Sequence, residues 1–235
     1  MNTAPPPAPA PPLPLLLLLL SVTTGLVDAV SVLGLGKVFT ANMTGNIVFL
    51  GFAAVGTPGF HPVAYIVAIG GFLAGAFLAG RTGKRHAGRP LRRWLMAAAL
   101  VETALLWAAA LVSRGFDVAT QAPDGALLAI IVLTALAMGF RNATVRQLKV
   151  PDLTTTVLTL TLTGLAADSR PAGGANPNWG RRIASVVAIF IGAALGAWLL
   201  ARGSMALPLA LAGALIMGGT IACTCHPACR APAAT

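Results

Sequence analysis

The sequence has few charged and few aromatic residues, and both shortages exclude classes of protein. Only 9% of its 235 residues are charged and 6% are aromatic, whereas a soluble domain has about 25% charged residues. Too few polar side chains remain to form a surface that faces water. With 57% hydrophobic residues and a mean hydropathy of +0.83, the composition predicts a protein that lies almost entirely within a lipid bilayer.

Two further features of the composition argue against nucleic-acid binding and against a disulfide framework. The net charge is +10, but Lys and Arg stand between apolar runs, as topology signals do, and do not alternate with aromatics as in nucleic-acid binding. The cysteines are few and clustered, which excludes a disulfide framework; they are Cys223, Cys225 and Cys229. We expect a frayed tail over 223–235, with a soft-metal site as the alternative.

The apolar runs predict an all-α bundle of membrane helices. A spanning helix needs about 20 apolar residues. A proline-rich head, residues 1–12, is expected to be a disordered tail. After it, the runs cover 13–36, 40–55, 62–80, 94–112, 125–140, 153–166, 183–201 and 205–222.

The connectors set the topology. The stretch 81–93 holds six Lys or Arg and no acid, so it should be cytoplasmic, and 113–124 should then face outward. Two interpretations remain open: all eight segments cross, or six cross while 40–55 and 153–166 are short or re-entrant. The six-crossing interpretation is favoured, because it places more Lys and Arg inside and because those two segments are the shortest and most polar.

Weak internal similarity predicts two repeats, 13–112 and 125–222. Gly25 to Ala29 resembles Gly139 to Ala143, and each match is followed by a Thr-rich stretch. Gly71-x-x-x-Gly75 resembles Gly192-x-x-x-Gly196, and both patterns predict close helix packing. The matches occur in the same order in both halves, which favours duplication.

One string of residues resembles a known family signature. Gly25-x-x-Asp28-Ala29 followed by Val38–Asn46, with its Ala-Asn-Met-Thr-Gly-Asn sequence, is similar to the YoaK-type family of uncharacterised bacterial integral membrane proteins. The stretch 150–159 resembles a second signature of that family. The resemblance implies a helical protein of the bacterial inner membrane with about six helices, and it implies no substrate and no catalytic residue.

Three polar residues lie inside the apolar runs and are candidates for function. Asp28 lies in the middle of the first run, where a carboxylate costs about 2.5–3.5 kcal/mol, so it predicts an ion or proton site or a structural hydrogen bond. Asn142 occupies the corresponding place in the second half. Glu102, within 94–112, is either a second proton carrier or a partner for a polar neighbour. Arg141 and Arg146 are interpreted as topology anchors, with the steering of an anion as the alternative.

Two polar interruptions occur at corresponding positions of the halves. Asn42, Thr44, Gly45 and Asn46 form the densest polar cluster inside an apolar run, and they must line a cavity or bond across the protein. Thr155, Thr159 and Thr163 share one face of a helix, as a hydroxyl-lined track or as back-bonded threonines. Short polar segments at matching places are typical of transporter sites.

No enzymatic motif was found, and no cofactor or metal site is predicted. The sequence has no Walker loop, His-Glu-x-x-His motif or Gly-x-Ser-x-Gly elbow. We therefore expect a secondary transporter or permease for a small solute or ion. The alternatives are a non-catalytic membrane subunit or scaffold and, less favoured, an intramembrane enzyme acting on a lipid-like substrate.

Overall fold

A computed structural model describes residues 12–150 and 158–230, and within these residues the chain is helical with no β-strand. The tail predicted for 1–12 lies outside this part, except for Pro12. The helices are α1 (Leu13–Gly34), α2 (Met43–Ala54), α3 (Pro62–His86), α4 (Leu91–Val112), α5 (Asp124–Leu148), α6 (Leu158–Ala167), α7 (Trp179–Ala201) and α8 (Ala206–Cys225).

Six helices, α1, α3, α4, α5, α7 and α8, are long and apolar enough to cross a bilayer. The helix α2 has 12 residues, or about 18 Å at 1.5 Å per residue, which is well short of a hydrocarbon core of about 30 Å. The described part of α6 is shorter still, with 10 residues. These lengths agree with the six-crossing prediction.

Two predicted helix ends were placed too early. The helix α3 runs on to His86 and so includes half of the basic connector, and α5 runs on to Leu148 instead of ending at Phe140. In both cases the hydrophobic run stops at an arginine while the backbone stays helical, because Arg and Lys are good helix formers. Residues 153–157 of the predicted sixth run lie outside the described part.

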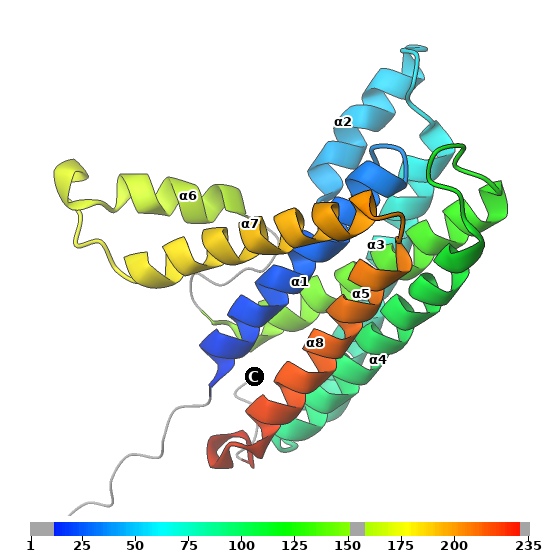
Figure 1. The fold of residues 1–235 in the computed structure, drawn as a ribbon. Coiled ribbons are helices and arrows are strands. Elements are labelled where there is room, and N and C mark those ends of the chain that lie inside the picture. Colours follow the sequence, from blue (N-terminus) through cyan, green and yellow to red (C-terminus); the bar gives the residue numbers. More distant parts are fainter. Residues whose placement is uncertain (1–11, 151–157, 231–235) are drawn as a thin grey trace, which may run out of the picture.

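The helix α1 forms the centre of the bundle. Its most hydrophobic window is 67% buried, against 22% for α7 and 28% for α3. The most extensive packing joins α3 to α5, α1 to α7 and α4 to α8, and α4·α5 and α1·α8 contacts connect these pairs. Figure 1 shows α4 and α8 side by side, with α7 crossing α1. The outer faces of α3 and α7 carry exposed Leu, Ile, Phe and Trp side chains, as lipid contact requires.

Glycines bring two pairs of helices into backbone contact. A Cβ atom on Gly25 of α1 would overlap the carbonyl oxygen of Ile189, and one on Gly192 of α7 would overlap that of Val22. On the other side of the bundle, Gly75 of α3 and Gly139 of α5 approach backbone carbonyls in the same way. Close packing of this kind is what holds helices together where no hydrophobic effect acts between them.

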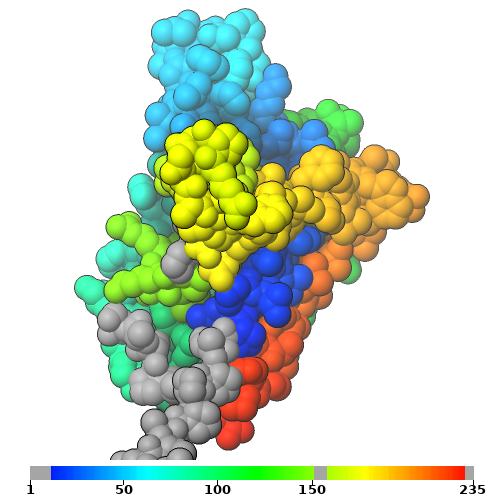
Figure 2. All heavy atoms as spheres, turned by 90° about the vertical axis from the view of Figure 1, so that its left-hand side faces the viewer, coloured from blue at the N-terminus to red at the C-terminus, as the bar shows by residue number. Residues whose placement is uncertain are grey.

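The two short helices lie away from the centre of the bundle. Figure 1 shows α2 beside the start of α3 and α6 alongside the first half of α7. Figure 1 shows α6 and the first half of α7 extending away from the other helices, and in Figure 2 α2 with the start of α3 forms the upper end of the molecule. Aromatic contacts of Phe49 with Phe39, Phe60 and Tyr65 join α2 to its surroundings.

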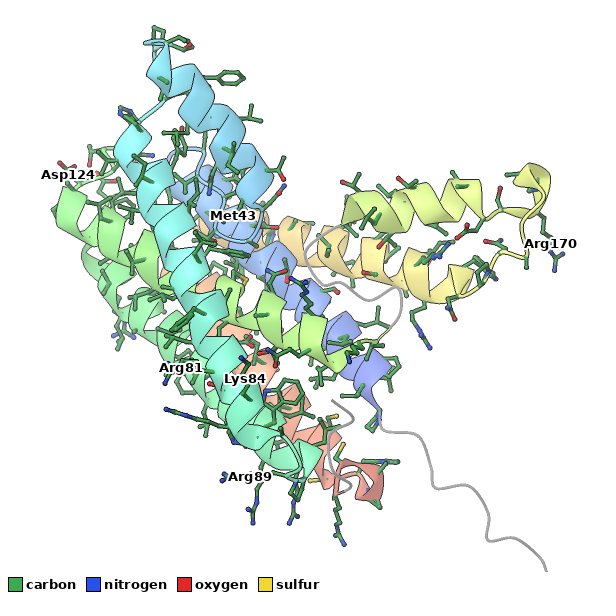
Figure 3. The ribbon with its side chains drawn as sticks, turned by 180° about the vertical axis from the view of Figure 1, so that it is seen from behind. Met43, Arg81, Lys84, Arg89, Asp124 and Arg170 are labelled. Atoms are coloured by element: carbon green, nitrogen blue, oxygen red, sulfur yellow. The ribbon has the colours of Figure 1, made fainter. Side chains whose placement is uncertain are left out.

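The ends of the bundle differ in charge. Figure 3 shows Arg81, Lys84 and Arg89 at one end, and Asp124, at the start of α5, at the other. Figure 1 shows the C-terminal end of α8 beside the start of α4, at the basic end of the bundle.

Candidate functional site

An ion pair lies in the middle of the bundle. Arg141 of α5 donates from Nε to Glu102 Oε2 of α4 at 2.8 Å, and the two side chains are 0% and 4% exposed. Glu102 is 11 residues into α4, or about 16 Å from the start of that helix, which is near mid-membrane depth. Ionisable side chains at this depth are costly, and they point to the interior and pair with each other.

The helix α1 supplies the remaining oxygens around the guanidinium group. Arg141 Nη1 donates to Thr23 Oγ1 at 2.8 Å, to Thr24 Oγ1 at 3.2 Å and to the Leu20 carbonyl at 3.3 Å. Both threonine hydroxyls in turn donate to the Leu20 carbonyl. These back-bonds turn the hydroxyl lone pairs toward Arg141. Arg141 thus connects the central helix to the pair formed by α4 and α5.

Two buried polar atoms of this centre lack partners within the described part of the chain. They are Arg141 Nη2, which carries two N–H groups, and Asp28 Oδ1. Asp28 lies one helical turn beyond Thr24 on the same face of α1, and Arg141 is close enough to act on it electrostatically. In a region of low dielectric, an unpaired donor or acceptor is expensive. The arrangement therefore has binding capacity that the described side chains leave unused.

Within the part of the chain that the structure describes, the space beside this centre is small. A cavity of about 20 Å³ borders Glu102 and Thr144, with room for about one water molecule. Thr144 Oγ1 also has no partner among the described residues, so a water there would have polar groups to bind. Two larger cavities, of about 620 and 570 Å³, open at the two ends of the bundle, and neither is lined by Asp28, Glu102 or Arg141.

The predicted cluster at 42–46 divides into different roles. Asn46 is buried, and its side chain accepts from the Phe39 N–H at 2.9 Å and donates to the Phe39 carbonyl. Gly45 leaves room for the Phe39 ring, which a Cβ would meet at 2.6 Å. These two residues fix the loop that precedes α2. Asn42 and Thr44 are exposed at the start of that helix. Whether they take part in binding stays a prediction.

The matching residues of the second half are also separated. Asn142 is half-buried, and its Nδ2 donates to the Met138 carbonyl at 3.0 Å. Thr155 lies outside the described residues. Thr159 and Thr163 are exposed on α6, and Thr161 is the buried threonine of that helix. The structure therefore brings only Asp28 and Glu102, of the predicted site residues, into the charged centre.

Arg141 is the member of the centre that the sequence analysis missed. It was interpreted as a topology anchor at the end of a helix, because the hydrophobic run stops at Phe140. Instead, α5 continues for two more turns, and Val145 remains buried on it. Val145 and Leu148 recur at helical spacing after Arg141, and this was the signal for a longer helix.

Metal binding finds no support at this centre. Within residues 12–150 and 158–230, no three His, Cys, Asp or Glu side chains come together as a metal site would require. The charged centre also places an arginine, which cannot act as a ligand, between its two acids.

Six apolar spans around a buried charged pair define a polytopic, all-α integral membrane protein. Comparison with known families places it more narrowly. The chain belongs to the family described as "Protein of unknown function (DUF1275)", whose model matches residues 16–222. It is also similar to the "UPF0700 transmembrane protein YoaK" of Bacillus subtilis (strain 168), with 33% identity over 149 residues, which is 63% of each chain. The resemblance found in the sequence is thereby confirmed. No solved structure matches.

Proposed function

We propose that the protein is a secondary transporter or permease for a small solute or ion, and that Asp28, Glu102 and Arg141 form its central site. The observation that carries the proposal is the pair of buried polar atoms, Asp28 Oδ1 and Arg141 Nη2, that have no partner among the described residues. A purely structural network would be expected to satisfy its own donors and acceptors. This centre holds a full ion pair and still leaves a carboxylate oxygen and two N–H groups unused.

The charges suggest a separate role for each residue. Glu102 and Arg141 neutralise each other through their 2.8 Å contact. Asp28 is the acid of the centre whose charge this pair does not neutralise, so a proton or a small cation would balance its negative charge. Intramembrane acids of this kind are typical of ion pathways and proton relays. In this proposal, Asp28 carries the coupling ion and Arg141 holds the centre together across three helices.

Transport requires that the closed centre open toward each side in turn. The glycine contacts at Gly25 and Gly192, and at Gly75 and Gly139, join helices at their backbone surfaces. In this proposal, α7 moves against α1, and α3 against α5, along these contacts. The short helices α2 and α6 would form the ends of the route. Asn42, Thr44 and Thr159 are proposed to contact the solute there after opening, and Asn142 to contact it on α5, next to Arg141.

The two halves are proposed to be inverted repeats. In support, α1 packs on α7 as α5 packs on α3, and a short helix precedes both α3 and α7. The glycine contacts refine the alignment. Gly75 and Gly192 occupy equivalent places against the other half, whereas the sequence match paired Gly71 with Gly192. The two registers differ by one helical turn, a shift that a pattern of small residues every four positions cannot resolve.

A non-catalytic membrane subunit is the second candidate, and the small volume of the central cavity, about 20 Å³, is the observation that favours it. An enzyme is the less favoured alternative, because Asp28 and Glu102 are the only acids at the centre among the described residues, and Glu102 is held by Arg141. We propose that the protein is not an enzyme. We place it in the bacterial cytoplasmic membrane, where the basic connector faces the cytoplasm.

Reconstitution tests the transport proposal directly. Purified protein is placed in liposomes that contain a pH-sensitive dye, and gradients of Na⁺, K⁺, phosphate, small carboxylates and amino acids are imposed in turn. Proton flux or charge movement is recorded by fluorescence and on a solid-supported membrane. The expected result is flux with a subset of these solutes that Asp28→Asn abolishes and Asp117→Asn, in the exposed connector, retains.

Two outcomes would overturn the proposal. The first is flux through Asp28→Asn equal to that of the unchanged protein, since this would remove Asp28 from the mechanism. The second is the absence of flux with every solute in protein that is folded by circular dichroism and monodisperse in detergent. That result would favour the membrane subunit.

A further inference from the structure

Two cysteine side chains meet at the end of α8. Cys223 Sγ, in the last turn of the helix, lies 3.9 Å from Cys229 Sγ in the following turn, Pro227–Arg230. The two residues are 5% and 0% exposed and belong to the hydrophobic core, whereas Cys225 is exposed. The sequence analysis expected a frayed tail here. Instead, the turn packs against α4 and α8 and brings the two thiols together.

The side of the membrane decides what such a pair can be. The end of α8 lies at the basic end of the bundle (Figure 3), which is cytoplasmic in the proposed topology. Disulfides are rare in the reducing cytoplasm, where neighbouring cysteines more often bind metal or act in catalysis. We favour metal binding over catalysis here, because both thiols belong to the hydrophobic core and face each other.

We propose that Cys223 and Cys229 bind one soft monovalent metal ion, with Cu(I) as the natural candidate. Soft thiolate ligands select Cu(I), zinc and iron–sulfur clusters, and iron–sulfur clusters need four ligands, more than this pair offers. Zinc in structural sites needs four ligands, and the described residues offer no group of three His, Cys, Asp or Glu. Two metal–sulfur bonds of about 2.3 Å each reach at most about 4.6 Å between sulfurs, so the observed 3.9 Å needs little movement.

The surroundings of the two cysteines provide a path for the metal ion to enter and positive charge to balance the metal dithiolate. Cys223 and His226 line the cavity of about 620 Å³ that opens between the first turns of α1 and the end of α8, and Figure 2 shows these two segments adjoining. Binding releases both thiol protons and leaves a metal dithiolate with one net negative charge. The basic connector 81–93 at the same end of the bundle favours that charge.

A second sulfur type lies close to the site. The Met96 thioether of α4 is 3.8 Å from Thr224 Oγ1, next to Cys223 in the chain. A thioether is a soft ligand that suits Cu(I). Met96 is therefore the residue most ready to complete a three-coordinate site by a side-chain rotation. The site is separate from the charged centre and stands whether or not the protein transports a solute.

The experiment uses the full chain, purified in detergent under a reducing, oxygen-free atmosphere. Cu(I) and, separately, the redox-inert Ag⁺ are titrated against a chromophoric competitor. We expect one equivalent of either ion per chain. Cys223→Ser and Cys229→Ser should each lose that equivalent, and Cys225→Ser, which removes the exposed thiol of the same turn, should keep it. X-ray absorption of the copper form should show sulfur ligands at low coordination number.

Folding and oxidation are measured in parallel. Each variant is compared by circular dichroism and thermal unfolding without metal, so that loss of the turn is distinguished from loss of ligands. Equal Ag⁺ binding by Cys223→Ser and the unchanged protein would overturn the proposal. So would loss of two free thiols without bound metal, because that result identifies the pair as a disulfide.

Discussion

Arg141 Nε lies 2.8 Å from Glu102 Oε2, and neither side chain is more than 4% exposed. Removing one partner of a buried pair strands the other charge and costs about 3–5 kcal/mol, whereas replacing both by apolar residues is often neutral. We therefore expect Glu102→Leu or Arg141→Met alone to lower the unfolding temperature sharply in detergent micelles. The double variant should recover most of the loss, and additive losses would contradict a direct pair.

The glycine contacts predict that alanine substitutions at two positions of α3 have different effects on stability. Gly75→Ala places a methyl group against the Leu136 carbonyl, which is backbone and cannot rotate away. It should destabilise the protein by about 1–3 kcal/mol, the usual cost of overpacking. Gly70 has nothing within 4 Å of an added Cβ, so Gly70→Ala should be neutral or gain up to about 1 kcal/mol from helix propensity. Thermal unfolding of both variants gives the comparison.

Asn46 should hold the loop before α2. Asn46→Ala removes both side-chain bonds to the Phe39 main chain and leaves buried backbone groups unpaired, at about 1–3 kcal/mol. Hydrogen exchange followed by mass spectrometry should show faster exchange in the segment that contains Phe39. Asn42→Ala, at an exposed position nearby, is the control and should leave this exchange unchanged. Equal effects of the two substitutions would contradict the assigned role.

The six-crossing topology predicts which connectors face the cell exterior. In a background without native cysteines, Ala119→Cys should react with a membrane-impermeant maleimide on intact cells. Arg85→Cys, in the basic connector, should react only after the inner membrane is permeabilised. Arg85 lies in the last turn of α3, and Ala119 lies in the connector between α4 and α5. The opposite labelling pattern would reverse the orientation and place the Cys223–Cys229 site outside the cytoplasm.

Asp117 gives a prediction for pH. The Thr120 hydroxyl and the Ala119 N–H both donate to its carboxylate, and they lower the pKa of Asp117 below the ordinary value of 3.8. A lowered folded-state pKa means that this turn is fully stabilised above the ordinary pKa and loosens as the pH falls through the folded value. Thr120→Val should raise the pKa of Asp117, measured by carboxyl carbon NMR. An unchanged pKa would show that the hydroxyl bond does not form.

Much of the fold followed from the sequence, because partition into lipid is a local property of the chain. Runs of about 20 apolar residues predicted the six spans, whereas the orientation inferred from the connector at 81–93 stays a prediction. The short runs around Met43–Ala54 and Leu158–Ala167 were recognised as unlike the others. Asp28 and Glu102 could be singled out for the same reason, since an acid inside an apolar run must be explained wherever it occurs.

The partners of those acids depended on the tertiary structure. Glu102 and Arg141 are 39 residues apart on different helices, and no local pattern indicates that one faces the other. The same holds for Cys223 and Cys229, which became a pair only because the turn after α8 packs against α4. By itself the sequence determined that this chain spans a membrane and which of its residues are out of place there. Only helix packing decided which of those residues meet, because side-chain pairing across helices depends on rotation and register that composition does not encode.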